Sequence, residues 1–283
     1  MTADPQPVEI TAADGYALGG TLFATDGADT VVIVHPATAV PQGFYRRFAA
    51  HIQQRGWTVL TYDFRGIGAS APESLKGFAG QASDWGLLDM PAALRWAERE
   101  LTPRRVFFVG HSAGGQQAGL IDTPDSVTAM VTVSAQSGFW GYQGGVEKLR
   151  VLIVMGLVVP VLARAAGYLP WSRLAAGEDL PRNAALEWAR WCRSPRYLLG
   201  DAALPLHRYA NFRAPVLAYS IDDDDWGTAR SVDAMMRAYP NLERRHLVPA
   251  QHGLKKLGHM GYFRQGSEAL WDEAIEWFER AAG

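Results

Sequence analysis

The chain has almost no cysteine, and this limits the chemistry that can hold it together. Its one thiol, Cys192, has no partner within the sequence, so an internal disulfide is excluded. Residues 1–7 contain neither a basic start nor an apolar core, so no secretory signal is visible. Both features predict a protein of the cytoplasm.

No excess of charge of either sign is present. The sequence has 27 Lys and Arg against 29 Asp and Glu, which gives a formal net charge of -2. The two signs are interspersed, so composition offers no field that would attract nucleic acid or an anionic membrane. A small-molecule substrate is therefore the expected partner, and the oligomeric state is left open.

Long hydrophobic runs are also scarce. The longest nearly apolar run, residues 151–163, lies between Arg150 and Arg164 and contains Gly156 and Pro160. A membrane-spanning helix needs about 20 apolar residues. The run is shorter than that and is interrupted, so it predicts a buried helix or a lid and no integral membrane span.

Motifs for metals and cofactors are missing as well. No His or Cys pair has metal-ligand spacing, and no P-loop occurs. Residues 66–71 formally fit G-x-G-x-x-A after a strand, but Pro72 and Gly77 follow where a dinucleotide site needs a helix. We therefore expect neither a cofactor nor a metal.

The sequence does contain a regular alternation of strand and helix patterns. Asp14-Gly15 is a turn between two short β segments and predicts an N-terminal hairpin. Apolar β-rich runs follow at 30–34, 57–62, 106–109, 127–133 and 215–219, and a further strand is predicted at 243–248. Helical patterns lie at 44–55, 84–100, 228–239 and 266–281. This order predicts an α/β fold with a mostly parallel central sheet and helices on both faces.

The alternation lapses between residues 137 and 210. This stretch contains the apolar run, helix-like segments separated by Gly and Pro, and Trp140, Trp171, Trp188 and Trp191. An interruption of this length inside a sheet fold predicts a helical cap or lid insertion. The sheet core would then comprise residues 1–136 and 211–283.

The segment 110–114, Gly-His-Ser-Ala-Gly, is the strongest chemical signal. It matches G-x-S-x-G, directly follows the apolar run at 105–109 and precedes a small-residue helix pattern at 113–120. This order of strand, sharp turn and helix is the nucleophile elbow, in which flanking glycines hold a serine exposed above a sheet. Ser112 is therefore the candidate nucleophile.

A serine hydroxyl needs a neighbouring histidine as its base, and the histidine needs a carboxylate to orient it. Four consecutive aspartates, residues 222–225, follow the predicted strand at 215–219. His252 and His259 both follow the next predicted strand. Taken alone, these residues leave both choices open.

Acyl transfer also needs N–H donors for the developing oxyanion. The backbone N–H of Ala113 follows the nucleophile at a helix N-terminus and predicts the first donor. The second is expected in the loop after the first buried strand, at His35-Pro36-Ala37-Thr38. Because Pro36 has no N–H, Ala37 is the candidate.

Three further segments carry a family resemblance that covers nearly the whole chain. Residues 63–70, Asp-Phe-Arg-Gly-Ile-Gly-Ala-Ser, resemble the D-x-R-G-x-G-x-S loop of the lysophospholipase-like and serine-aminopeptidase-like branch of the α/β-hydrolase superfamily. Residues 258–264 and the cap stretch 188–193 look like an uncharacterised bacterial subgroup of predicted hydrolases. The resemblance implies the α/β-hydrolase fold.

The resemblance also orders the candidate site residues. It implies the chain order Ser, acid, His, with His259 as base. The family commonly places the acid nine residues after the proline that opens its strand, which from Pro215 is Asp224, with Asp223 as second choice. Related enzymes often have His-Gly where this chain has His-Pro, so it departs from them at the second oxyanion donor.

These observations predict a serine hydrolase of the esterase, lipase or thioesterase kind, acting through an acyl-enzyme on a small substrate. The tryptophans of the cap favour an apolar substrate, unless they only hold the cap to the sheet. An acyltransferase or cyclase would use the same residues. A non-catalytic ligand-binding protein on this fold is the alternative from another class.

Overall fold

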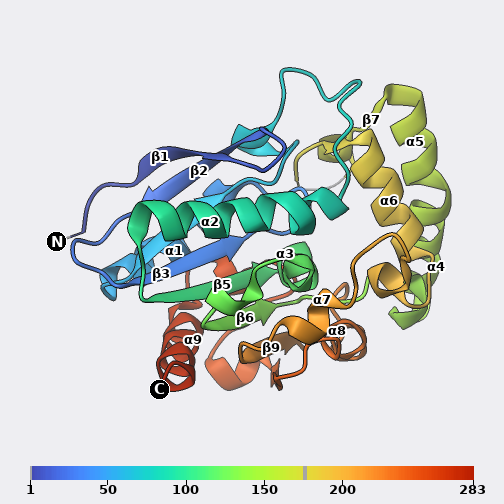
Figure 1. Ribbon diagram of the computed structural model, residues 1–283. Helices are drawn as coiled ribbons and strands as arrows, with labels where there is room; N and C mark the ends of the chain where they lie inside the picture. The colour runs from blue at the N-terminus through green and yellow to red at the C-terminus, as the bar shows by residue number, and fades with distance from the viewer. Residues whose placement is uncertain (1, 175–176) are drawn as a thin grey trace.

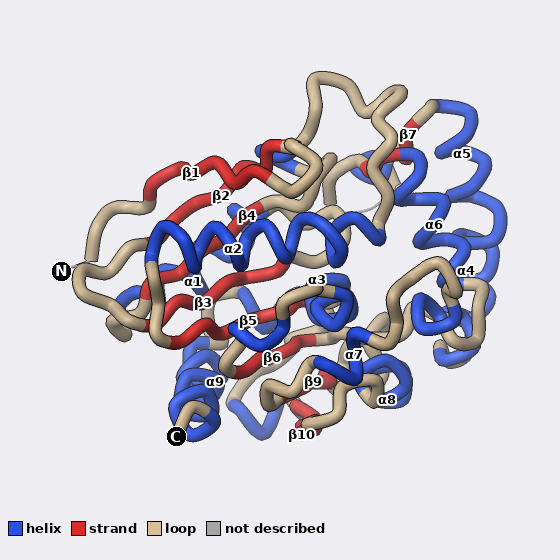
Figure 2. Tube along the Cα trace, viewed as in Figure 1, coloured by secondary structure: helices blue, strands red, loops and turns tan. Residues whose placement is uncertain are grey.

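The computed structural model describes residues 2–174 and 177–283, and within them an eight-stranded sheet forms the centre of the molecule (Figures 1 and 2). Its strand order is β1-β2-β4-β3-β5-β6-β9-β10, with only the β1–β2 and β2–β4 pairs antiparallel. The strands are β1 (Gln6–Thr11), β2 (Ala17–Phe23), β3 (Thr30–His35), β4 (Thr58–Tyr62), β5 (Arg105–His111), β6 (Ala129–Val133), β9 (Val216–Ile221) and β10 (Leu242–Leu247). The predicted mostly parallel sheet is confirmed.

Helices cover both faces of this sheet, because its central strands are apolar on both sides. One apolar cluster joins the sheet to α1 (Arg46–Gln54) and α9 (Glu268–Ala281). The other joins it to α2 (Met90–Leu101), α3 (Ala113–Gln117) and α8 (Ala229–Met236). Every residue of β3 is buried, as its continuous apolar run predicts.

The chain between β6 and β9 forms a separate group of helices beyond one end of the sheet (Figure 1). This group contains α4 (Gly145–Ile153), α5 (Val159–Ala166), α6 (Arg182–Cys192) and a small pairing of β7 (Tyr168–Leu169) with β8 (Leu180–Pro181). The short α7 (Arg208–Asn211), later in the same stretch, lies instead against the sheet core near α8 (Figure 1). The group of helices occupies the stretch predicted to be a cap. The boundaries at 137 and 210 stay a prediction.

The expectation that the apolar run 151–163 is too short and too broken to span a bilayer was wrong in its premise. A π-helical turn, Val154–Val158, joins α4 to α5 in one 22-residue helix that is long and apolar enough, by length and composition, to cross a membrane. Pro160, which has no N–H to donate, lies just after the π-helical turn, where the regular hydrogen-bond pattern of the α-helix is already interrupted. The helix ends at Gly167, whose φ of 81° suits a residue without a Cβ.

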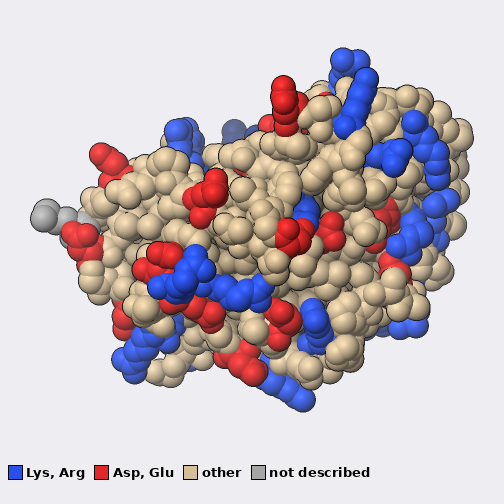
Figure 3. Space-filling model, turned by 45° about the horizontal axis from the view of Figure 1, so that its top comes forward, with Lys and Arg blue, Asp and Glu red and all other residues tan. Residues whose placement is uncertain are grey.

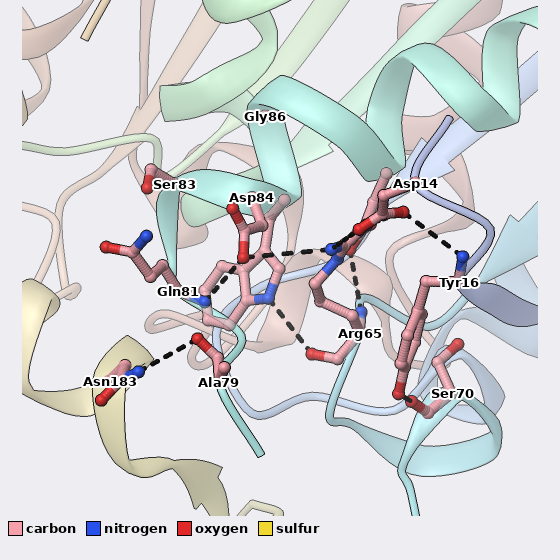
Figure 4. Close-up of polar contacts among 12 residues, drawn as sticks. Asp14, Tyr16, Arg65, Ser70, Ala79, Gln81, Ser83, Asp84, Gly86 and Asn183 are labelled. Atoms are coloured by element: carbon pink, nitrogen blue, oxygen red, sulfur yellow. Dashed lines mark hydrogen bonds and ion pairs between the residues drawn. The ribbon is translucent and has the colours of Figure 1, made fainter. Parts of the chain in front are cut away.

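An ionic network fixes the D-x-R-G loop outside the sheet (Figure 4). Arg65 contacts Asp14 of the hairpin turn and Asp89 at the start of α2, each at 2.7 Å. Burial raises the pKa of Asp89 to about 7, although the Arg65 charge opposes this rise. Asn183 of α6 donates to the Ala79 carbonyl at 3.0 Å and ties the inserted helices to the segment that follows this loop.

Candidate active site

Ser112 lies in a strained turn between β5 and α3. Its φ of 48° and ψ of -112° are unusual for a residue with a side chain. A Cβ at Gly110 would lie 2.5 Å from the Gly115 Cα, and a Cβ at Gly114 would clash with the His35 carbonyl. The two motif glycines are therefore required by close backbone contacts, which hold the serine at the end of the strand.

The structure brings together one aspartate and one histidine from the candidates. His259 Nδ1 lies 2.8 Å from Asp224 Oδ2. The other carboxylate oxygen accepts the backbone N–H groups of Trp226 at 2.9 Å and Gly227 at 2.8 Å. Burial alone would raise the pKa of Asp224, but the nearby His259 and these hydrogen bonds lower it to about 2. The side chain is therefore a fixed carboxylate at neutral pH.

The rival residues have other partners. Asp223 accepts the N–H groups of Leu257 at 3.0 Å and Gly258 at 2.8 Å, so it positions the loop in front of the aspartate-bound histidine. Asp223, the second choice for the acid, is therefore engaged by the backbone and not by the imidazole. His252 Nδ1 lies 3.5 Å from Glu273 Oε1, outside the pair just described.

Ser112 and His259 line the same cavity, which has a volume of about 410 Å³. Within it, the Ser112 hydroxyl donates a long hydrogen bond of 3.4 Å to Gln136 Oε1. The other lining residues, mostly apolar, are Ala37, Thr38, Val40, Gln116, Gly138, Arg150, Val151, Val154, Met155, Val158, Trp171, Leu174, Trp188, Tyr197, Trp226 and Met260. The serine therefore opens on a largely apolar cavity.

The four cap tryptophans divide into two pairs. Trp171 and Trp188 line the cavity, whereas Trp140 and Trp191 are not among its lining residues. Trp226, two residues after the acid candidate, also lines it and stacks on Trp188 with ring centroids 6.1 Å apart. Trp226 was not predicted from the sequence, although its place beside the four aspartates could have indicated it.

One expected oxyanion donor is free of a helical partner and the other is engaged. The N–H of Ala113 stands at the first position of α3, where no carbonyl of the helix can accept it. The N–H of Ala37 instead donates to the Tyr45 hydroxyl at 2.8 Å. Ala37 therefore fits the second-donor role poorly, and the neighbouring Thr38 lies on the cavity wall as an alternative.

Comparison with known proteins agrees with this architecture. Residues 29–150 match the family model described as alpha/beta hydrolase fold. The matched region includes the central strands β3 to β6 and the elbow. The chain is an α/β-hydrolase-fold protein. A search of curated protein sequences gave no significant match.

Solved structures similar to this α/β-hydrolase-fold protein include several esterases. The Pyrococcus furiosus esterase Pf2001 has a TM-score of 0.64 at 18% identity, covering 99% of this chain and 92% of that chain. An esterase of Thermogutta terrifontis has a TM-score of 0.62 at 15% identity, covering 98% and 100%. Est1E of Butyrivibrio proteoclasticus, with ferulic acid bound, has a TM-score of 0.61 at 15% identity, covering 97% and 98%. At these identities the likeness establishes the fold.

In this α/β-hydrolase-fold protein, two buried hydrogen bonds that no sequence motif indicates hold the backbone of His259 in place. His111 Nε2 lies 2.9 Å from the His259 carbonyl, and His111 Nδ1 lies 2.9 Å from the Tyr45 hydroxyl. Burial lowers the pKa of His111 to about 3, so its ring is neutral. The carbonyl can only accept, so the ring proton is on Nε2 and Tyr45 donates to Nδ1. Tyr45 and His111 thus fix the backbone at residue 259.

Proposed function

We propose that this α/β-hydrolase-fold protein is a serine hydrolase that cleaves ester-like bonds of small, apolar acyl substrates. The observation that carries the proposal is the Asp224–His259 pair facing the same cavity as the strained Ser112. A buried, hydrogen-bonded carboxylate, an imidazole and an elbow serine are the parts that acyl transfer requires.

Each side chain has a defined step in this mechanism. Asp224 accepts from His259 Nδ1, which leaves Nε2 as the nitrogen that takes the Ser112 proton. Ser112 Oγ attacks the substrate carbonyl, and the N–H of Ala113 stabilises the oxyanion. The imidazolium then protonates the leaving group, and the acyl group stays on the serine. Water, activated by the same histidine, releases the acid.

The Ser112 hydroxyl must change its hydrogen bond for this reaction to begin. It now donates to Gln136 over 3.4 Å, a weak contact that costs little to exchange. Catalytic hydrogen bonds are often loose without substrate and tighten in the complex. Bound substrate would therefore direct the hydroxyl from Gln136 towards His259.

The cavity supports the apolar part of the proposal. Trp171, Trp188 and Trp226 form an aromatic wall of the cavity. Val154 and Val158 line it from the helix 145–166. Such a surface favours an acyl chain or an aromatic ring over a charged group. Two of the proteins with similar structures are esterases, which supports an ester substrate for this chain.

A panel of p-nitrophenyl esters of graded acyl length tests this function. The wild type should release acid from at least one ester, and Ser112→Ala should lower kcat by about 10⁴-fold or more. Ser126→Ala, which alters an exposed serine in the turn before β6 that does not line the cavity, is the matched control and should keep full activity. No turnover of any ester by the wild type, or equal turnover by Ser112→Ala, would overturn the proposal.

A further inference from the structure

The helix from Gly145 to Ala166 presents an apolar stripe to solvent. Of the six large hydrophobic side chains found exposed in the described residues, five lie on this helix. Their spacing of three or four residues places them on one helix face, with exposed fractions between 47% and 83%. We call Val146, Leu149, Ile153, Leu157 and Val161 the apolar stripe.

The opposite face of the same helix is firmly seated in the protein. Val151, Met155, Val159 and Ala163 are each at most 2% exposed. Val151 and Met155 also line the cavity that contains the candidate nucleophile. A transmembrane orientation would remove this face from its packing. A helix held by one face and apolar on the other is suited to lie flat in a membrane interface.

Basic side chains border the apolar stripe. On the same helix Lys148, Arg150 and Arg164 are exposed, and the helix's one acidic residue, Glu147, is ion-paired to Arg150. Figure 3 shows Lys and Arg gathered along the edge of the molecule formed by α4, α5 and α6. From residue 137 to 210 the sequence has nine Lys and Arg against five Asp and Glu, although the whole chain is slightly acidic. This local charge complements an anionic surface.

We propose that the apolar stripe, with Lys148 and Arg164 beside it, docks the protein on anionic lipid membranes with the helix parallel to the bilayer plane. The apolar side chains enter the boundary between headgroups and acyl chains, and the basic side chains meet lipid phosphates. A second copy is a poorer occupant. A two-fold contact between identical surfaces would bring the same basic side chains against one another.

Co-sedimentation of the full chain with vesicles tests this proposal. The wild type should bind phosphatidylcholine vesicles that contain phosphatidylglycerol, and added salt should weaken binding. The triple variant Leu149→Gln/Leu157→Gln/Val161→Gln should lower the apparent affinity by about tenfold or more, because three apolar side chains no longer enter the lipid. None of these three side chains lines the cavity.

A double variant that removes two charges beside the apolar stripe, called the charge pair, measures the electrostatic contribution to vesicle binding, and a second double variant is its control. Lys148→Gln/Arg164→Gln should weaken binding by about fivefold for each charge removed. Arg99→Gln/Arg280→Gln removes two exposed charges from α2 and α9, away from the inserted helices, and should leave binding unchanged (Figure 1). The charge pair keeps every apolar side chain, so it reports on docking even if the triple variant were to fold poorly.

Three outcomes would overturn the proposal. The wild type could remain in the supernatant with both kinds of vesicle. It could bind vesicles of phosphatidylcholine alone equally well, while Lys148→Gln/Arg164→Gln binds with the same affinity as the wild type. It could sediment in the ultracentrifuge as a dimer that the triple variant dissociates, with no vesicle binding. Because docking does not use the nucleophile, Ser112→Ala should bind vesicles like the wild type. Failure here is therefore distinguishable from failure of the proposed hydrolase activity.

Discussion

At the scale of single residues, the site depends on a carboxylate that cannot be moved. Asp224 accepts two backbone N–H groups and the His259 ring, and it is only 3% exposed. Its neighbour Asp223 is also anchored, but to the backbone before His259. The two aspartates thus have different duties, one towards the imidazole and one towards the loop.

Replacing each aspartate by asparagine separates these duties. Asp224→Asn should lower kcat on an activated ester by about 10⁴-fold, because the amide no longer sets the His259 tautomer. Asp223→Asn loses part of the loop support and should cost far less in kcat, with about 1–3 kcal/mol of unfolding free energy. Kinetics and urea unfolding measure both effects. A larger kcat loss in Asp223→Asn than in Asp224→Asn would contradict these roles.

The low pKa of Asp224 also predicts how stability depends on pH. The folded-state pKa of about 2 lies below the usual value of 3.8, so the carboxylate stabilises the folded state above that usual value. This contribution, about 2 kcal/mol, is lost as pH falls through about 4 towards 2. The difference in unfolding free energy between wild type and Asp224→Asn should shrink as the pH falls below about 4. The exposed Asp222→Asn serves as control, and a difference that grows on acidification would contradict the prediction.

The sequence predicted the positions of the candidate residues better than their hydrogen bonds. Ser112 could be found because two glycines and a preceding strand are local features of the sequence. The hydrogen bond from the Ala37 N–H to Tyr45 could not be found in this way. The Tyr45 hydroxyl is itself held by His111, 66 residues further along the chain. Contacts of this kind depend on how separate elements meet in space.

At the scale of elements, the alternation of strand and helix patterns was sufficient to locate every strand of the parallel sheet, including β10, which is mostly polar or charged. The helix at 145–166 was underestimated because Gly156 and Pro160 were interpreted as interruptions. Gly156 lies within the π-helical turn, and Pro160 follows just after it, so the helix continues through both residues. Backbone adjustments of this type have no clear sequence signal.

The tryptophans of the inserted segment are expected to have two different roles, because two of them line the cavity and Trp191 is buried outside it. Trp171→Ala and Trp188→Ala enlarge the cavity and should shift the preferred acyl length, with kcat/KM changing by about 10–200-fold for a methylene that fits differently. Trp191→Ala empties a buried site and should instead lower the unfolding free energy by about 3–5 kcal/mol. The ester series and thermal unfolding distinguish the two effects.

The opposite pattern would contradict this division. If Trp191→Ala alone changed the length preference, the cavity would not be the substrate site. If all three variants only lowered stability, the tryptophans would serve packing, and the apolar-substrate part of the proposal would fall.

At the scale of the whole molecule, the even charge composition hides an uneven distribution. The net charge of -2 combines an excess of basic residues between 137 and 210 with an excess of acidic residues elsewhere. The expectation that no anionic membrane would attract the chain rested on the average. The side that carries the inserted helices is basic and apolar together, which the composition could not indicate.

The central claim is that Ser112 is the nucleophile of the molecule, and covalent labelling tests it most directly. A fluorophosphonate reacts with a serine only where a base and an oxyanion site activate it. Peptide mapping by mass spectrometry should find one adduct, on Ser112, at one per chain. Labelling should vanish in folded Ser112→Ala and slow strongly in Asp224→Asn. Undiminished labelling of Ser112→Ala, or an adduct on another serine of the wild type, would contradict the account.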